Sequence, residues 1–145
     1  MNVDRGGFAE GVIRMLIMMA RSRGEVRQSR LERSNEILNS REPFRSLGAD
    51  RRARIIAEQT LILDFAPDQA FSALPHLLPT RDERQRAIDT VQEIAGNVTE
   101  MSESTLRMLA RLREVLELPP LTFGVAAITP GVPVAAQTPE SVPGK

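Results

Sequence analysis

The spacing of hydrophobic residues along the chain predicts a protein built of α-helices. From Asp4 to Ser22, apolar side chains recur three or four residues apart and form a stripe wide enough for a central helix. Further stripes predict other elements: helices over Gln28–Asn39 and Arg51–Asp64, a turn over Pro43–Leu47, and helices that begin near Pro67, after Thr80 and after Ser102. No period-2 strand of useful length is present. The expected fold class is all-α, a bundle of six or seven helices with short connections.

Polar residues mark several expected helix ends. Thr80 and Glu83 have the spacing of a capping box, and Ser102 and Asp50 are residue types that favour the N-cap position. Pro75 is expected to kink or end the helix that contains it. The Arg51–Asp64 helix is expected to lie in the core, because its apolar residues, together with the following Phe65, lie on all sides.

The first expected helix carries two charged residues. Glu10 and Arg14 lie four positions apart, the spacing at which opposite charges pair on a helix surface. We therefore expect them to form an ion pair on the polar side of that helix. Arg14 also interrupts the apolar run Val12–Ala20, which is too short to span a bilayer, so neither a transmembrane segment nor a signal peptide is expected.

The C-terminal residues differ in composition from the rest of the chain. The segment 118–145 holds six of the ten prolines and three of the nine glycines. Proline at this density interrupts helices and removes backbone hydrogen-bond donors. The sequence therefore predicts a helical domain over residues 1–117 and a Pro-rich tail over 118–145 that is disordered or loosely docked, with Leu121–Phe123 able to pack back on the bundle.

The composition weighs against several kinds of chemistry. The chain has no cysteine, which excludes disulfides, zinc-thiolate sites and cysteine nucleophiles and fits a cytoplasmic location. It has no Trp or Tyr to stack on bases, so specific nucleic-acid binding is not expected. His76 is the single histidine and lies near no nucleophile motif, and Gly6-Gly7 lacks the Lys-Ser/Thr of a phosphate loop. We therefore expect no catalytic residue and no enzymatic activity.

A repeat is visible when the chain is shifted by 75 residues. The segments ARSRGEVRQSRL and AGNVTEMSESTL then align, each a helix, a turn with one hydrophobic residue, and a second helix. The hydrophobic residues are Val26 and Met101, and each is expected to lie under its turn. The alignment predicts two helix–turn–helix corners related by a pseudo-twofold axis.

The order of elements, the two corners and the segment IIAEQTLILDFAPDQAFSALPHLLPTRDERQRAIDTVQEIA resemble the tellurite-resistance TerB-like helical domain over about residues 8–117. A looser similarity, carried by the run EQ…D…A…LP.LL, is to the helical C-terminal regions of some polyhydroxyalkanoate-related bacterial proteins with an α/β-hydrolase portion. The first resemblance implies a TerB-like bundle and, as one alternative, a divalent-metal or tellurite stress-response sensor. The second implies an accessory domain in polyhydroxyalkanoate metabolism.

The resemblance also implies where a metal site belongs. The family's corners typically read Ala-Asp-Gly-x-hydrophobic-x-x-x-Glu, with the acids thought to hold a divalent cation. By position, the Asp falls on Arg23 and Val98, and the Glu falls on Arg30 and Thr105. The acidic residues that remain near the corners are Glu25, Glu100 and Glu103. Ca²⁺ takes six to eight oxygens, so we expect no metal site and no other cofactor; these three glutamates are the candidate ligands near the corners, and a sensor would also need ligands such as Asp64 or Asp68.

Charge is spread unevenly, although the net charge is zero. Residues 1–54 carry twelve arginines against seven acidic residues, and the first corner holds a cluster of five: Arg21, Arg23, Arg27, Arg30 and Arg33. Arginine clusters bind carboxylates and phosphates. The sequence therefore predicts a non-enzymatic interaction module that contacts an acidic protein or an anionic surface through this Arg-rich corner, with a homodimer left open. The alternative is a solvated helix face neutralised by nearby glutamates.

Overall fold

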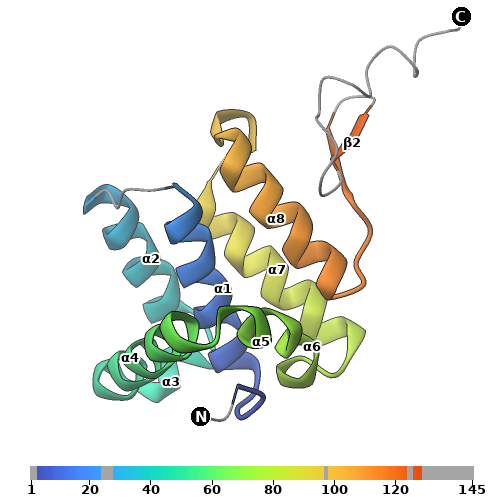
Figure 1. The fold of residues 1–145 in the computed structure, drawn as a ribbon. Helices are drawn as coiled ribbons and strands as arrows, with labels where there is room; N and C mark the ends of the chain where they lie inside the picture. Colours follow the sequence, from blue (N-terminus) through green and yellow to red (C-terminus); the bar gives the residue numbers. More distant parts are fainter. Residues whose placement is uncertain (1–2, 24–27, 97, 124–125, 129–145) are drawn as a thin grey trace, which may run out of the picture.

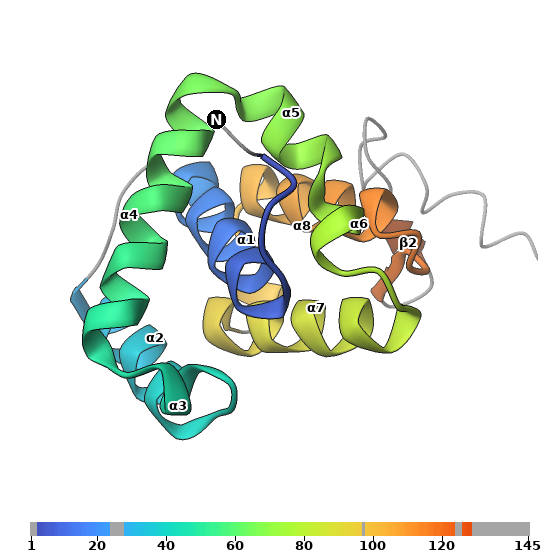
Figure 2. The ribbon, with the colours of Figure 1, turned by 90° about the horizontal axis from the view of Figure 1, so that it is seen from below.

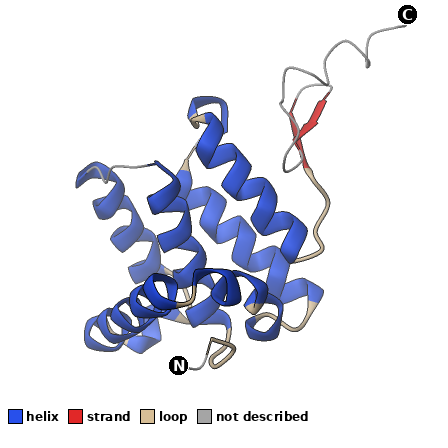
Figure 3. Ribbon diagram, in the orientation of Figure 1, coloured by secondary structure: helices blue, strands red, loops and turns tan. Residues whose placement is uncertain are grey.

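The computed structural model describes residues 3–23, 28–96, 98–123 and 126–128, without the side chains of 28–31, 33, 121–123 and 126–128. Over these residues the chain is almost entirely helical, which confirms the all-α prediction (Figures 1 and 3). Its elements are α1 (Phe8–Arg23), α2 (Gln28–Ser40), α3 (Phe44–Leu47), α4 (Ala49–Phe65), α5 (Pro67–Ser72), α6 (Leu74–Leu77), α7 (Arg81–Ala95), the 3-10 turn η1 (Val98–Glu100), α8 (Glu103–Val115), β1 (Leu121–Phe123) and β2 (Ala126–Ile128). The described helices outnumber the six or seven predicted because α3 and α6 are separate four-residue helices.

Helix α1 occupies the centre of the bundle. It lies against α4, α6, α7 and α8, and Figure 2 shows it in the middle with α4 along one edge. Its side chains are therefore buried on nearly every side, as the wide apolar stripe predicted. The core joins α1 to the inner faces of its neighbours, with Met15, Leu74, Ile88 and Leu109 among its fully buried members.

The predicted caps of the last two long helices are confirmed. Thr80 Oγ1 accepts the N–H of Glu83 at 3.1 Å, and Glu83 Oε1 accepts the N–H of Thr80 at 3.2 Å, which completes the capping box of α7. Ser102 Oγ accepts the N–H of Thr105 at 3.2 Å at the start of α8.

The predicted N-cap of α4 was wrong. The helix begins at Ala49, two residues earlier than an Asp50 cap requires, and Gly48 occupies the N-cap position with φ +83° and ψ 162°. Only glycine adopts this backbone region without strain, so it replaces a side-chain cap with a sharp change of direction. Asp50 instead lies in the first turn of α4, where its negative charge interacts favourably with the helix dipole.

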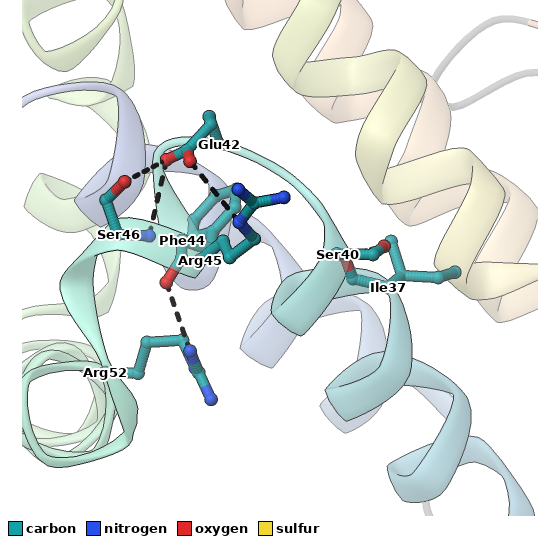
Figure 4. Close-up of polar contacts among 7 residues, drawn as sticks. All are labelled: Ile37, Ser40, Glu42, Phe44, Arg45, Ser46 and Arg52. Carbon is teal, nitrogen blue, oxygen red and sulfur yellow. Dashed lines mark hydrogen bonds and ion pairs between the residues drawn. The ribbon is translucent and has the colours of Figure 1, made fainter.

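The turn that precedes α4 packs one aromatic side chain into the core. Phe44 is buried, as expected for this segment, and its carbonyl accepts a hydrogen bond from Arg52 Nη1 at 3.1 Å (Figure 4). Glu42 Oε1 accepts the hydroxyl of Ser46 at 2.6 Å, and Arg45 lies 3.7 Å from the other oxygen of Glu42. These contacts tie α3 to the first turn of α4.

The helix expected around Pro75 is divided into two. The break falls at Ala73, ahead of the predicted position, and Pro75 lies in the first turn of α6, where a missing N–H removes no helical hydrogen bond. Leu77 and Leu78 are fully buried. A Cβ added to Gly11 would lie 3.3 Å from Leu78 Cγ, so α1 approaches this segment closely.

The described part of the C-terminal segment contains an element that its proline content did not predict. Leu118 is buried, and β1 pairs antiparallel with β2, with Leu121 opposite Ile128. Strand β2 lies against α8, so this part of the segment packs back on the bundle. Residues 129–145 lie outside the described part, and disorder there stays a prediction. The first corner includes residues 24–27, also outside it, so the pseudo-twofold repeat is not confirmed.

Candidate functional site

The structure describes part of the predicted Arg-rich corner. Arg21 Nη2 lies 2.7 Å from Asp64 Oδ1, so this guanidinium is paired with a carboxylate of α4. Arg23 is half-buried at the end of α1. Arg27 lies outside the described residues, and so do the side chains of Arg30 and Arg33. The corner as a partner-binding surface therefore stays a prediction.

The candidate metal ligands that belong to the described residues do not form a cluster. Glu103 pairs with Arg107 at 2.7 Å, Glu100 is exposed in η1, and Glu25 lies outside the described residues. Among the residues that the structure describes, no three His, Asp or Glu side chains are grouped closely enough to hold a metal ion. His76 is exposed on the short helix α6.

The predicted surface pair between Glu10 and Arg14 was wrong. Arg14 is completely buried, its Nε donates to Gln59 Oε1 at 2.7 Å, and its Nη1 donates to the carbonyl of Ala70 at 2.8 Å. Glu10 instead accepts the N–H of Gly7 at 2.8 Å and caps the start of α1. Arg14 therefore links α1 to α4 and α5 rather than facing solvent.

Burial sets the electrostatics of this link. It lowers the pKa of the Arg14 guanidinium, while the negative charges of Glu58, Asp4 and Glu10 act in the opposite direction. Arg14 Nη2 and Gln59 Nε2 have no hydrogen-bond partner among the described residues. A buried charge with few partners is costly. Both hydrogen bonds that Arg14 makes therefore help to hold α4 and α5 against α1.

Helix α4 exposes an apolar surface opposite this link. Residues two positions apart on a helix differ by about 200°, so with Gln59 held against Arg14, Ala57 and Leu61 point away from the core. Ile56, Leu61 and Phe65 are 42%, 51% and 74% exposed. We call the ridge of exposed apolar residues on this side the α4 outer face: Ala53, Ala57, Leu61 and Phe65. Ile56 is exposed on the flank of the helix, about 140° around it from Leu61.

This exposure corrects a prediction. Ile56, Leu61 and Phe65 were expected in the core, but α4 lies along one edge of the bundle and turns only one side toward α1 (Figure 2). Its buried residues, Ile55 and Ile62 among them, supply the apolar contacts on that side. The remaining apolar side chains have no packing role that the described residues reveal, and such exposure is typical of interaction sites.

A groove of about 580 Å³ adjoins the α4 outer face. Its lining comes from the N-terminal segment, α1, α3 and α4: Arg5, Gly6, Glu10, Leu47, Arg51, Arg54, Ile55, Ala57, Glu58 and Leu61. Arg5, Arg51 and Arg54 are exposed, and none of them forms an ion pair with another described residue. The groove therefore combines an apolar floor with three guanidinium groups that are available to an acidic ligand.

No family model, no curated protein and no solved structure matches the chain. Among the described residues, every helix is too short or too polar to cross a membrane.

Proposed function

We propose that this chain is a non-enzymatic helical interaction module that binds an acidic protein partner on the α4 outer face and the groove beside it. The observation that carries the proposal is the exposure of Leu61 and Phe65 on one side of one helix. Complete burial of such a side chain from full exposure is worth roughly 1.5–3 kcal/mol. Leu61 is 51% and Phe65 74% exposed, so covering both would contribute more than half of that amount for each.

The acidic character of the partner follows from the groove. Arg5, Arg51 and Arg54 face two carboxylates, Glu10 and Glu58, and Glu10 already accepts the N–H of Gly7. An excess of unpaired guanidinium groups favours carboxylates that can accept two hydrogen bonds at once. The anionic contact expected of the Arg-rich corner is thus supported better at the groove, since Arg21 of that corner already has an intramolecular partner.

The alternatives rest on the resemblance alone. A divalent-metal or tellurite sensor requires a group of oxygen ligands, and the described residues contain no such group. A role in polyhydroxyalkanoate metabolism has no contact in the described structure to support it. The non-enzymatic part of the proposal rests on composition, since the chain has no cysteine and one histidine, His76, without a nucleophile motif nearby.

The experiment that tests the proposal is photo-crosslinking from position 65 in cells that produce the protein. A benzophenone amino acid replaces Phe65, and in the matched control it replaces Ser104, which is exposed on α8. We expect discrete protein adducts from position 65, none from position 104, and loss of the position-65 adducts in a Leu61→Asp background. Equal adduct patterns at the two positions would overturn the proposal.

A further inference from the structure

The α4 outer face has a pattern of side-chain sizes that complements itself. Ala53, Ala57, Leu61 and Phe65 lie four residues apart and form one ridge along α4. The small residues occupy the first half of the ridge and the large residues the second half. When two such ridges run in opposite directions, the large residues of each face the small residues of the other.

We propose that the partner of the α4 outer face is a second copy of this chain, with the two α4 helices packed antiparallel about a twofold axis at the level of residue 59. This inference rests on the proposed function. In this arrangement Ala57 of each copy faces Leu61 of the other, and Ala53 faces Phe65. Ridges of residues four apart are the commonest contact between packed helices, and a twofold interface requires a self-complementary surface.

The charges along α4 have the same symmetry. Arg54 lies five positions before residue 59 and Asp64 lies five positions after it, so Arg54 of each copy faces Asp64 of the other. Both side chains are exposed. Asp64 is paired with Arg21 through Oδ1, and a carboxylate has capacity for further donors. The acidic ligand expected at Arg54 is thus supplied by the second copy.

A parallel arrangement lacks this complementarity. It places Arg54 against Arg54 and Phe65 against Phe65, so like charges and large side chains meet. The antiparallel arrangement also sets the two helix dipoles in opposite directions. An unrelated partner needs neither the size symmetry nor the charge symmetry about residue 59, whereas a second copy needs both.

The size of the contact surface sets the expected affinity of the dimer. An α4 of 17 residues is about 25 Å long, and one helix face of that length covers less than the ~800 Å² per partner that stable complexes bury. We therefore expect a dimer that dissociates in the micromolar range.

Sedimentation equilibrium of the full chain over about 1–500 µM tests the inference. We expect a reversible monomer–dimer equilibrium whose dissociation constant rises about tenfold or more in Leu61→Asp and Phe65→Asp, and stays unchanged in the matched control Ser104→Asp. Thermal melts check that each variant is folded, and exposed positions 61 and 65 are expected to tolerate aspartate in the monomer.

A charge exchange tests the pairing itself. Arg54→Asp and Asp64→Arg should each weaken the dimer, and the double variant should recover most of the loss, because the pair is restored with its signs exchanged. Since Asp64→Arg also removes the intramolecular pair with Arg21, Arg21→Gln reports that loss alone and is expected to leave the dimer intact.

Crosslinking tests the direction of the helices. The chain has no cysteine, so Ala53→Cys and Phe65→Cys can be used without background. A bis-maleimide reagent about 8 Å long, close to the spacing of packed helices, reacts with two thiols by addition and should join the two variants when they are mixed. Each variant alone should not react with itself, because two copies of position 53 lie about 18 Å apart along the antiparallel pair.

The outcomes separate the two proposals. Three results would overturn the second-copy inference. They are a monomer throughout the concentration range, a dimer whose dissociation constant is unchanged by Leu61→Asp, and self-crosslinking of each cysteine variant alone. If position 65 still crosslinks to another protein in cells, the proposed function survives that result. If position 65 yields adducts no different from those at position 104, the proposed function fails as well.

Discussion

Arg14 Nε donates a hydrogen bond to Gln59 Oε1 over 2.7 Å, between two side chains that are both fully buried. This bond joins the central helix α1 to α4 and fixes the rotation of α4 about its own axis. With Gln59 directed inward, Ala57 and Leu61 are directed outward. Together with the buried residues Ile55, Ile62 and Leu63 on the same side of α4, this contact sets which residues of the helix the molecule offers to a partner.

The first prediction concerns the coupling of this pair. Gln59→Leu should lower the free energy of unfolding by about 2–3 kcal/mol, because it leaves the buried Arg14 charge with one acceptor fewer. In an Arg14→Met background the same change should cost less than about 1 kcal/mol, since no charge remains to be solvated. Urea denaturation of the four proteins measures the difference. Equal costs in the two backgrounds would show that the hydrogen bond carries no coupling.

The second prediction concerns the glycine that begins α4. Gly48→Ala should destabilise the protein by about 1–3 kcal/mol, because φ +83° and ψ 162° form a region that residues with a Cβ avoid. Nothing lies within 4 Å of a Cβ added there, so the cost is one of backbone conformation and not of space.

Gly7→Ala is the matched control for that prediction. A Cβ at Gly7 also meets nothing within 4 Å, but its φ lies outside the left-handed region. We expect a smaller loss than at Gly48, below about 1 kcal/mol, because alanine is less favourable than glycine at the N-cap of α1 but meets no backbone strain there. Thermal or urea unfolding of both variants distinguishes them, and equal losses would contradict the conformational explanation.

The third prediction concerns the capping box of α7. Thr80→Ala should cost about 1 kcal/mol, because the N–H of Glu83 loses its acceptor. Thr80→Ser keeps a hydroxyl in the same place and should cost only a few tenths of that. Differential scanning calorimetry measures both. A serine variant as unstable as the alanine variant would place the effect in the methyl group of Thr80 and not in the cap.

The fourth prediction concerns divalent cations. Adding Ca²⁺, Mg²⁺ or Zn²⁺ to chelator-treated protein should leave the melting temperature unchanged, since Glu103 is held by Arg107 and no ligand group is present among the described residues. A cation that binds the folded state adds about 2.7 kcal/mol at a hundredfold excess over its dissociation constant. A calorimetric titration measures binding directly. Stabilisation by one of these ions would revive the sensor alternative.

Hydrophobic periodicity predicted the helices well and the surroundings of single residues less well. It gave the central position of α1, and the spacing of Thr80 and Glu83 gave the cap of α7, because both depend on residues close together in the chain. It placed Arg14 on the surface, since a charged residue is rarely fully buried without a partner. Its true partner, Gln59, lies 45 positions away, and no local pattern reveals such a contact.

The candidate site was missed for a related reason. Apolar residues on every side of α4 predicted a buried helix, and the sequence does not show that only one of its sides meets α1. The arginines of the groove come from separate segments, Arg5 ahead of α1 and Arg51 and Arg54 on α4, and only the fold brings them together. The cluster that the sequence did reveal, from Arg21 to Arg33, is close in the chain, and its described member Arg21 has a partner within the fold.

The most direct test of whether a second copy covers the α4 outer face is a fluorine-19 spectrum of protein that contains 4-fluorophenylalanine. The chain has five phenylalanines, and Phe65 has the most exposed side chain among those described, so a Phe65→Leu variant identifies its signal. At low concentration we expect a soluble paramagnetic agent to broaden the Phe65 signal, and at high concentration we expect that signal to shift and become protected. A Phe65 signal that stays equally accessible over the whole concentration range would contradict the inference that a second copy covers this face.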